Sequence, residues 1–194
     1  MNALEAALVD IATFLEESAI PYMVIGGYAN LRWGRPRLTE DIDITVSVAE
    51  PSWPEFVAAV EKRYCPLAPN PLEFARQTRV IPISTSGGVR VDLVLSALGY
   101  EETAIRRAVR TDLGSAEVRI CTAEDLIVHK LIAARPRDLD DIEGIVIRRG
   151  AQLDRLYLDP LVEQIASTPE GTEATEFFRR CLEKAGLPPP RAER

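Results

Sequence analysis

The sequence predicts an α+β protein, in which a small mixed β-sheet with flanking helices is followed by a C-terminal helical lobe. Apolar runs of strand length alternate with helical apolar spacing in the first part of the chain. Beyond residue 121 the apolar residues follow helical spacing alone. We therefore expect a first domain over residues 1–120, a helical lobe over residues 121–187 and a disordered tail over residues 188–194.

The first 48 residues are expected to form a helix, a strand, a short helix and a second strand. Pro21 ends the first helix, and the pair Gly26-Gly27 lets the backbone turn tightly after the first strand. The second strand alternates strictly, so that Asp41 and Asp43 lie on one side and the isoleucines on the other. The predicted bounds are 3–18, 22–25, 28–33 and 41–48.

The middle of the chain is expected to contain a hairpin between two helices. Ser52 caps the first helix, three prolines indicate a loop over residues 65–72, and Ser86-Gly87-Gly88 joins the hairpin strands. The remaining elements are strands at 79–85 and 89–95, a helix at 98–109 and a last strand at 116–121.

The last part of the chain is expected to be helical. A capping-box-like pair, Thr122 and Asp125, begins the first of these helices, and Pro136 breaks the pattern. Gly150 ends the second helix. The predicted helices cover residues 122–134, 137–149, 154–166 and 172–185.

Composition and charge favour a cytoplasmic globular protein. Apolar residues make up 46% of the 194 residues, yet no apolar run approaches the ~20 residues that span a bilayer. The first 18 residues carry four acidic side chains and no Lys or Arg, unlike a signal peptide. The three cysteines lie far apart and match neither a disulfide framework nor a C-x-x-C metal site. A net charge of −7 argues against attraction of the whole surface to nucleic acid, although arginines cluster locally.

Three aspartates on two predicted strands indicate a metal site. Carboxylates as close as Asp41 and Asp43 repel each other unless a cation lies between them, and Mg²⁺ accepts carboxylate and phosphate oxygens. Asp92 interrupts an apolar strand, where a lone carboxylate is unfavourable unless it is paired or bound to metal. If the strands are neighbours, the three side chains converge and can hold two metal ions about 4 Å apart. Each aspartate alone is explained as well by a solvated strand end or an edge position.

The ordered set of motifs resembles the nucleotidyltransferase fold of the polymerase-beta type. These motifs are Gly26-Gly27, R-x-T-x-D-I-D ending at Asp43, and V-D-L-V around Asp92. The later segments E-D-L-I-V-H-K-L and R-P-R-D-L-D-D-I resemble the AbiEii-like branch, many members of which are toxins of bacterial toxin–antitoxin systems. The resemblance covers residues 20–150, and it implies that residues 1–120 form the catalytic domain and that the helical lobe completes the cleft.

The resemblance also implies a role for each motif residue. It assigns nucleotide contacts to Gly26, Gly27, Arg37, Thr39 and Lys130. It assigns two Mg²⁺ ions to Asp41, Asp43 and Asp92, with Asp92 also helping to deprotonate the acceptor hydroxyl. It places Lys130, Asp138 and Asp141 in the active cleft. Many relatives have Gly-Ser where this chain has Gly-Gly, which removes a hydroxyl contact to phosphate.

The residues alone leave the roles of Lys130 and the later aspartates open. Lys130 lies at the inner edge of the apolar stripe of its helix, where it either extends to solvent or serves an anion. Asp138 and Asp141 share a helix face, and Asp138 near the helix N-terminus equally complements the helix dipole. Arg135 or Arg137 is then the expected partner of Asp138.

We therefore expect a Mg²⁺-dependent enzyme that moves a nucleoside monophosphate from a nucleoside triphosphate to an acceptor hydroxyl. The resemblance favours a toxin that acts on RNA, such as the 3′ end of tRNA, with a possible antitoxin partner. The alternatives are a small-molecule nucleotidyltransferase of the antibiotic-modifying type and a catalytically silent nucleotide-binding module. The intact set of Asp41, Asp43 and Asp92 argues against the silent module.

Overall fold

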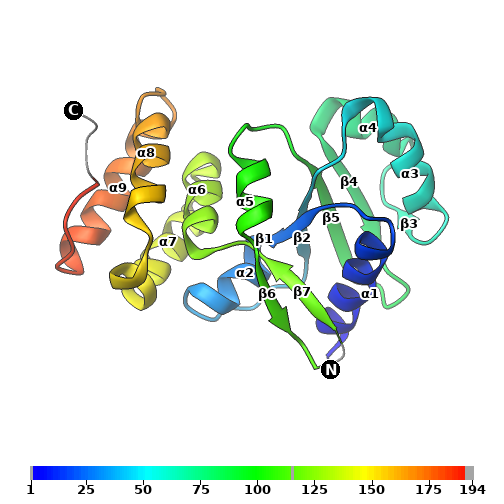
Figure 1. Cartoon of the computed structure of the whole chain (residues 1–194), viewed down its shortest axis with the longest axis horizontal. Coiled ribbons are helices and arrows are strands. Elements are labelled where there is room, and N and C mark those ends of the chain that lie inside the picture. Colours follow the sequence, from blue (N-terminus) through cyan, green and yellow to red (C-terminus); the bar gives the residue numbers. More distant parts are fainter. Residues whose placement is uncertain (1, 115, 191–194) are drawn as a thin grey trace. The chain divides into compact units, whose positions relative to one another are not determined.

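The computed structural model describes residues 2–114 and 116–190, and it divides into two compact units (Figure 1). The first unit comprises residues 1–28 and 38–121, and the second comprises residues 29–37 and 122–194. The short segment 29–37, which the sequence analysis included in the first domain, thus belongs to the helical unit. Of the tail that we expected to be disordered, residues 188–190 are in neither a helix nor a strand, and residues 191–194 lie outside the described residues.

The first unit contains a mixed sheet of seven strands within the described residues, in the order β3-β4-β5-β2-β1-β7-β6. Strand β2 is parallel to β5 and β1 is parallel to β7, whereas the other neighbours are antiparallel. The strands are β1 Tyr22–Ile25, β2 Ile42–Val46, β3 Cys65–Pro66, β4 Val80–Ser84, β5 Arg90–Leu95, β6 Val109–Asp112 and β7 Glu117–Ile120. The expected small mixed sheet is therefore confirmed.

The register of the central strands places apolar and acidic side chains on opposite faces of this sheet. A row of fully buried aliphatic residues crosses the strands in register: Val24, Ile44, Leu93 and Ile81. The adjacent row projects from the opposite face because side chains alternate along a strand: Ile25, Asp43, Asp92 and Pro82. A shift of one residue in the strand register would move the aspartates to the buried face. Burial of the apolar row therefore determines the face on which the aspartates lie.

The helices of the first unit are α1 Ala3–Glu17, α3 Trp53–Glu61, α4 Pro71–Thr78 and α5 Glu101–Arg107. A capping box between Asn2 and Glu5 begins α1, which packs against β7, while α5 packs against β1 and β2. A 3₁₀ turn over Glu50–Ser52 precedes α3, and the Ser52 side chain makes no cap hydrogen bond. The expected helix after Ser52 is therefore present without the expected cap.

Two expectations for the first unit were wrong. The expected loop over residues 65–72 instead contains β3 and the start of α4, because Asn70 accepts a hydrogen bond from the Glu73 N–H and Pro71 suits the first helical position. The expected helix over residues 98–109 ends at Arg107, and β6 follows it. There the Asp112 carboxylate accepts a hydrogen bond from the Gly114 N–H, in a turn that directs the chain back into β7.

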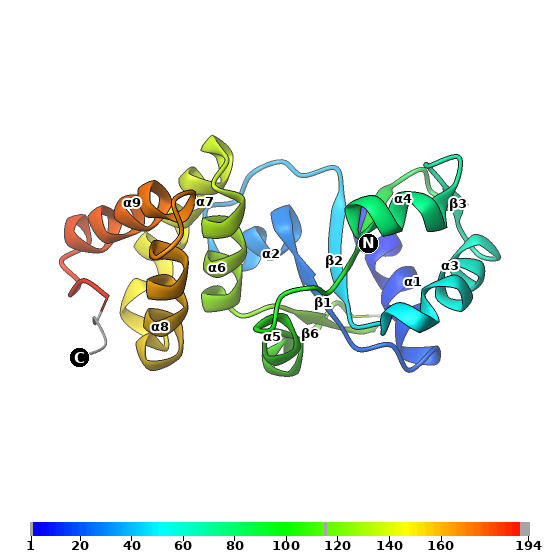
Figure 2. The ribbon, with the colours of Figure 1, turned by 90° about the horizontal axis from the view of Figure 1, so that it is seen from above.

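The second unit is a helical bundle. It contains the end of α2 Gly26–Trp33 together with α6 Ala123–Ala133, α7 Pro136–Arg149, α8 Arg155–Ala166 and α9 Gly171–Lys184. Thr122 caps α6 by accepting from the Asp125 N–H, as expected, and Pro136 takes the first position of α7. Helices α8 and α9 lie side by side (Figure 2) and bury Leu158 and Phe178. None of the helices in the described residues is long and apolar enough to cross a membrane.

Candidate functional site

Asp43, in the acidic row, makes a close contact with Gly26. Gly26 follows β1 directly and has a left-handed backbone, with a φ of +62°. A Cβ atom at this position would lie 1.9 Å from Oδ2 of Asp43, so the carboxylate occupies the space that a side chain would fill. Only glycine satisfies both the backbone angle and the contact. The Asp43 carboxylate thus lies against the first residue of α2, and the buried Gly27 follows in the same turn.

Replacing Gly26 with Ala is expected to displace Asp43 as well as strain the backbone. Gly88→Ala is a matched control, because Gly88 has a φ of +75° and open space around its Cα. The control variant should lose about 1–2 kcal/mol of unfolding free energy from the left-handed backbone alone. Gly26→Ala should lose more, and it alone should abolish nucleotide-dependent activity. Urea unfolding and an activity assay test this prediction. If the two substitutions reduce stability and activity equally, the close contact between Gly26 and Asp43 is contradicted.

Asp92 lies beside Asp43 on the neighbouring strand and is paired with an arginine. The two aspartates are in register on β2 and β5, and both are half-buried. Arg90 donates from Nε to Oδ1 of Asp92 at 3.0 Å and from Nη2 to Oδ2 at 3.1 Å. The hydrogen bonds and the charge of Asp92, together with the charges of Asp41 and Asp43, raise the pKa of Arg90. The sequence analysis missed Arg90, although its position two residues before Asp92 places both on one face.

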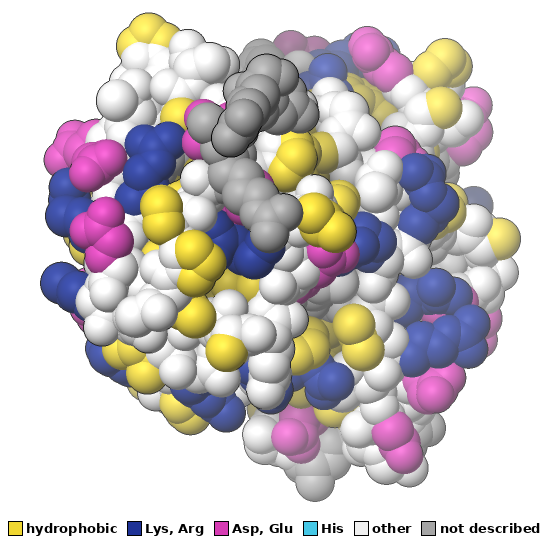
Figure 3. All heavy atoms as spheres, turned by 60° about the vertical axis from the view of Figure 1, so that its left-hand side comes forward, with side chains coloured by type: hydrophobic (Ala, Val, Ile, Leu, Met, Phe, Trp, Pro, Cys, Tyr) yellow, Lys and Arg dark blue, Asp and Glu magenta, His cyan; other side chains and the backbone are white. Residues whose placement is uncertain are grey.

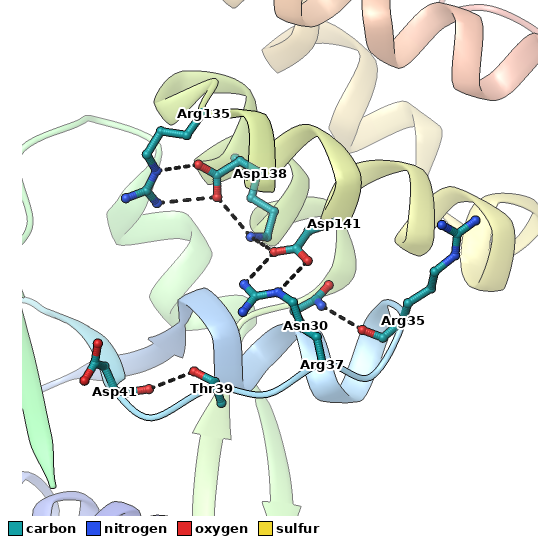
Figure 4. A network of polar contacts seen from close by, with 9 residues as sticks. Asn30, Arg35, Arg37, Thr39, Asp41, Arg135, Asp138 and Asp141 are labelled. Atoms are coloured by element: carbon teal, nitrogen blue, oxygen red, sulfur yellow. Dashed lines mark hydrogen bonds and ion pairs between the residues drawn. The ribbon is translucent and has the colours of Figure 1, made fainter.

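Asp41 and Thr39 lie in the segment that leads into β2. Asp41 is exposed, and the Thr39 hydroxyl donates to the Asp41 carbonyl at 3.2 Å (Figure 4). Thr39 therefore stabilises the turn before the strand, and its contact with a nucleotide stays a prediction.

The carboxylates suit a hard divalent cation by their chemistry. Asp43 and Asp92 offer only oxygen ligands, which Mg²⁺ prefers, and the missing Cβ of Gly26 leaves the room that Asp43 occupies. Within the described residues, no group of three or more His, Cys, Asp or Glu side chains is arranged to hold a metal ion. Both carboxylate oxygens of Asp92 instead accept from Arg90.

A separate network of ion pairs lies in the second unit, around the buried side chains of Lys130, Asp138 and Asp141 (Figure 4). Lys130 on α6 donates to Asp138 at 3.1 Å and to Asp141 at 2.6 Å, and only 4% of its side chain is exposed. Arg37 binds both oxygens of Asp141 at 2.8 Å, and Arg135 binds Asp138 at 2.6 Å. Three cations thus alternate with two carboxylates. Of the two partners expected for Asp138, Arg135 or Arg137, the structure pairs it with Arg135. Lys130 is buried rather than extended to solvent.

The cations of this network keep both carboxylates ionised. Burial alone would raise the pKa of Asp138, but the hydrogen bond from Arg135 and the charge of Lys130 lower it overall. Burial likewise opposes the ionisation of Asp141, but hydrogen bonds from Arg37 and Lys130 lower its pKa below the ordinary value. Nucleotide contacts of Lys130 and Arg37, and a role of the two aspartates in catalysis, stay predictions.

The segment over residues 29–37 is attached to α7 by the backbone as well as by Arg37. The fully buried Asn30 donates to the Arg35 carbonyl at 3.0 Å, and Arg148 donates to the Gly34 carbonyl. A Cβ at Gly144 would lie 3.0 Å from the Arg35 backbone nitrogen, so a larger residue there would require the two segments to shift apart. The sequence analysis missed Asn30 and Gly144. The hydrogen bond of Asn30 is local, to a residue five positions away, whereas the approach of Gly144 to Arg35 joins distant parts of the chain.

His129, the only histidine, has no cationic role at neutral pH. Burial and the charge of the adjacent Lys130 lower the pKa of His129 to about 4. Its imidazole is therefore neutral under physiological conditions.

Comparisons with known proteins agree with the fold. An antigenic nucleotidyltransferase-like protein from Paracoccidioides brasiliensis has a similar structure, with a TM-score of 0.54, 16% identity and coverage of 94% of this chain and 91% of that chain. The antibiotic-resistance factor ANT(2″)-Ia has a TM-score of 0.55 and 19% identity, over 91% of this chain and 98% of that chain. These likenesses show the fold. No curated protein sequence matches the chain.

The family is shown by a match to a sequence model. The model of the nucleotidyl transferase AbiEii toxin, type IV TA system, matches residues 12–167, which is most of the chain. The match includes the acidic row of the sheet and the buried ion pairs of the helical unit. The chain therefore belongs to the AbiEii family of nucleotidyltransferases.

Proposed function

We propose that this nucleotidyltransferase uses Mg²⁺ to transfer a nucleoside monophosphate from a nucleoside triphosphate to a hydroxyl of an RNA acceptor, such as the 3′ end of tRNA. The observation that carries the proposal is the in-register pair of Asp43 and Asp92 beside Gly26. A family whose members are toxins supports an inhibitory role for the reaction, which implies an antitoxin partner.

The three aspartates and the glycine pair each have a part in the proposed reaction. Asp41, Asp43 and Asp92 would hold Mg²⁺, which supplies charge stabilisation to the attacking and leaving oxygens when bound. The backbone N–H groups of Gly26 and Gly27, at the start of α2, suit the triphosphate oxygens. The acceptor hydroxyl forms a bond to the α-phosphorus, the bond to the bridging oxygen breaks, and pyrophosphate leaves. Asp92 can accept the hydroxyl proton.

The buried ion pairs of the second unit supply a local excess of positive charge. Arg37, Lys130 and Arg135 pair with Asp138 and Asp141, so these five side chains together carry one more positive than negative charge. Such an excess favours an anion such as a triphosphate nearby. We propose that Lys130 and Arg37 contact the nucleotide through this positive charge. Asp138 and Asp141 would hold the side chains of these two cations in position.

The charge distribution favours a small-molecule hydroxyl compound as the second candidate acceptor. The first unit has nine Lys and Arg against sixteen Asp and Glu, and therefore carries the whole net charge of −7. The second unit is neutral, with fourteen of each sign. On the face in Figure 3, basic and acidic side chains are interspersed. An acidic unit repels RNA phosphates, whereas a small acceptor needs no basic surface.

An acceptor screen tests the proposal. The full chain is incubated with Mg²⁺, each α-labelled nucleoside triphosphate, and either total tRNA or a set of aminoglycosides and other polyols. We expect label on tRNA, with a rate that falls steeply as salt rises because phosphate contacts release counterions. Label on a small molecule with little salt dependence would favour the second acceptor. No transfer to any acceptor would contradict the proposal.

A further inference from the structure

The pairing of Arg90 with Asp92 places a cation of the protein at the proposed metal site. Both N–H donors of the guanidinium edge engage the carboxylate, at 3.0 and 3.1 Å. This two-point geometry leaves neither oxygen of Asp92 without a donor. Arg90 begins β5, so it projects from the same face as Asp92 and Asp43.

The surroundings of Arg90 are those that the sequence analysis expected for a metal ion. Asp92 contributes hydrogen bonds and charge to the guanidinium, and Asp41 and Asp43 contribute charge. With Arg90 in place, the three carboxylates and one guanidinium have a formal charge of −2. Without any cation, the like charges would repel each other across one face of the sheet.

Breaking the ion pair between Arg90 and Asp92 costs little free energy. Its side chain is 51% exposed, so it can rotate towards solvent without disturbing the core. Partly exposed ion pairs contribute little to stability, because water and salt screen them. A divalent cation has twice the charge and can bind several carboxylates at once.

We propose that Arg90 is an internal counter-ion of the carboxylate site, which neutralises Asp92 in the metal-free protein and must leave Asp92 before a divalent cation binds. Arg90 is therefore a positioning residue that competes with the metal and lowers its affinity. This inference rests on the proposed metal site of the nucleotidyltransferase. It predicts the unusual result that removal of a side chain at the site tightens metal binding.

A titration with Mn²⁺ alone, followed by electron paramagnetic resonance of the free ion, tests the proposal without reference to activity. In buffer with 150 mM KCl, Arg90→Gln should bind Mn²⁺ about three- to tenfold more tightly than the wild-type chain. Arg90→Lys keeps the charge but loses the two-point geometry, so its affinity should lie between the two. In chelator, Arg90→Gln should also melt at a lower temperature than the wild type and regain the difference with Mn²⁺.

Arg110→Gln is the matched control. Arg110 also pairs with an acidic residue in the same sheet, Glu117 on the neighbouring strand, and both side chains are well exposed. Arg110→Gln changes the net charge of the protein by the same amount as Arg90→Gln. If its Mn²⁺ affinity is unchanged, the tighter binding of Arg90→Gln is due to the position of Arg90 beside the carboxylates. If Arg90→Gln binds Mn²⁺ as tightly as the wild type or more weakly, the proposal is overturned.

A second variant separates this inference from the proposed function. Asp43→Asn should abolish the specific binding of Mn²⁺ to the chain. If Asp43→Asn binds Mn²⁺ as the wild type does, the metal site itself is wrong and both proposals fail. If Asp43→Asn loses binding while Arg90→Gln gains nothing, only the role of Arg90 fails.

Discussion

Replacing Asp43 with Asn is expected to reduce nucleotidyl transfer by about a thousandfold while leaving the fold intact. Asp43 is central to the acidic row, because it is in register with Ile25 on one side and Asp92 on the other and lies against Gly26. Asn has the same shape but no charge, so the backbone and the contact persist while the anionic ligand is lost. Initial rates at saturating Mg²⁺ and nucleotide measure the effect.

Asp112→Asn is the control for this substitution. Asp112 ends an edge strand of the same sheet, where its side chain accepts a hydrogen bond from the Gly114 N–H. An Asn oxygen accepts the same bond, so we expect unchanged stability and activity. Transfer by Asp43→Asn within threefold of the wild-type rate, with both variants folded, would exclude Asp43 from the chemistry.

Replacing Lys130 with Met is expected to destabilise the second unit by about 3 kcal/mol. The substitution preserves the apolar part of the side chain but removes the cation that donates to both Asp138 and Asp141. These carboxylates are almost completely buried and would keep only Arg135 and Arg37, respectively, from the network. Urea unfolding measures the loss. Lys184→Met is the control, because Lys184 is 73% exposed and lies 4.0 Å from its partner Glu143.

At acidic pH, the free energies of unfolding of Lys130→Met and the wild type should differ less than at neutral pH. The pKa values of Asp138 and Asp141 are lowered in the folded wild type. The two carboxylates therefore stabilise the fold fully at pH values above their pKa in the unfolded chain, ~4, and this stabilisation is lost as the pH falls further. In the variant the carboxylates protonate more readily, which relieves the buried charge. The loss of unfolding free energy should thus be smaller at pH 4 than at pH 7. An equal loss at both values would contradict the ion-pair explanation.

The sequence predicts the central sheet well because its signals are local. Strict alternation in the strand that contains Asp43, and the apolar run around Asp92, specify two strands and the faces of their side chains. Their parallel pairing brings the two aspartates into register, which the sequence analysis could state only as a condition. The order of motifs then identified the family, and the match over residues 12–167 confirms it.

The missed elements depend on contacts that the sequence does not display. The helix expected over residues 98–109 extended to Val109, but Val109 begins β6, whose pairing with β7 outweighs the local preference. The segment over residues 29–37 belongs to the helical unit because Arg37 binds Asp141, which is 104 positions away along the chain. Arg90 was missed because an exposed arginine at the start of a strand is ordinary, and only the register of β2 and β5 surrounds it with acidic residues.

The position of the transferred phosphorus tests the central claim most directly. The chain is incubated with Mg²⁺, total tRNA and a nucleoside triphosphate that carries the label on either the α- or the γ-phosphate. Attack at the α-phosphorus predicts that the α-label enters the acceptor and the γ-label appears in pyrophosphate, with both signals lost in Asp43→Asn. A γ-label in the acceptor, or release of inorganic phosphate in place of pyrophosphate, would contradict nucleotidyl transfer.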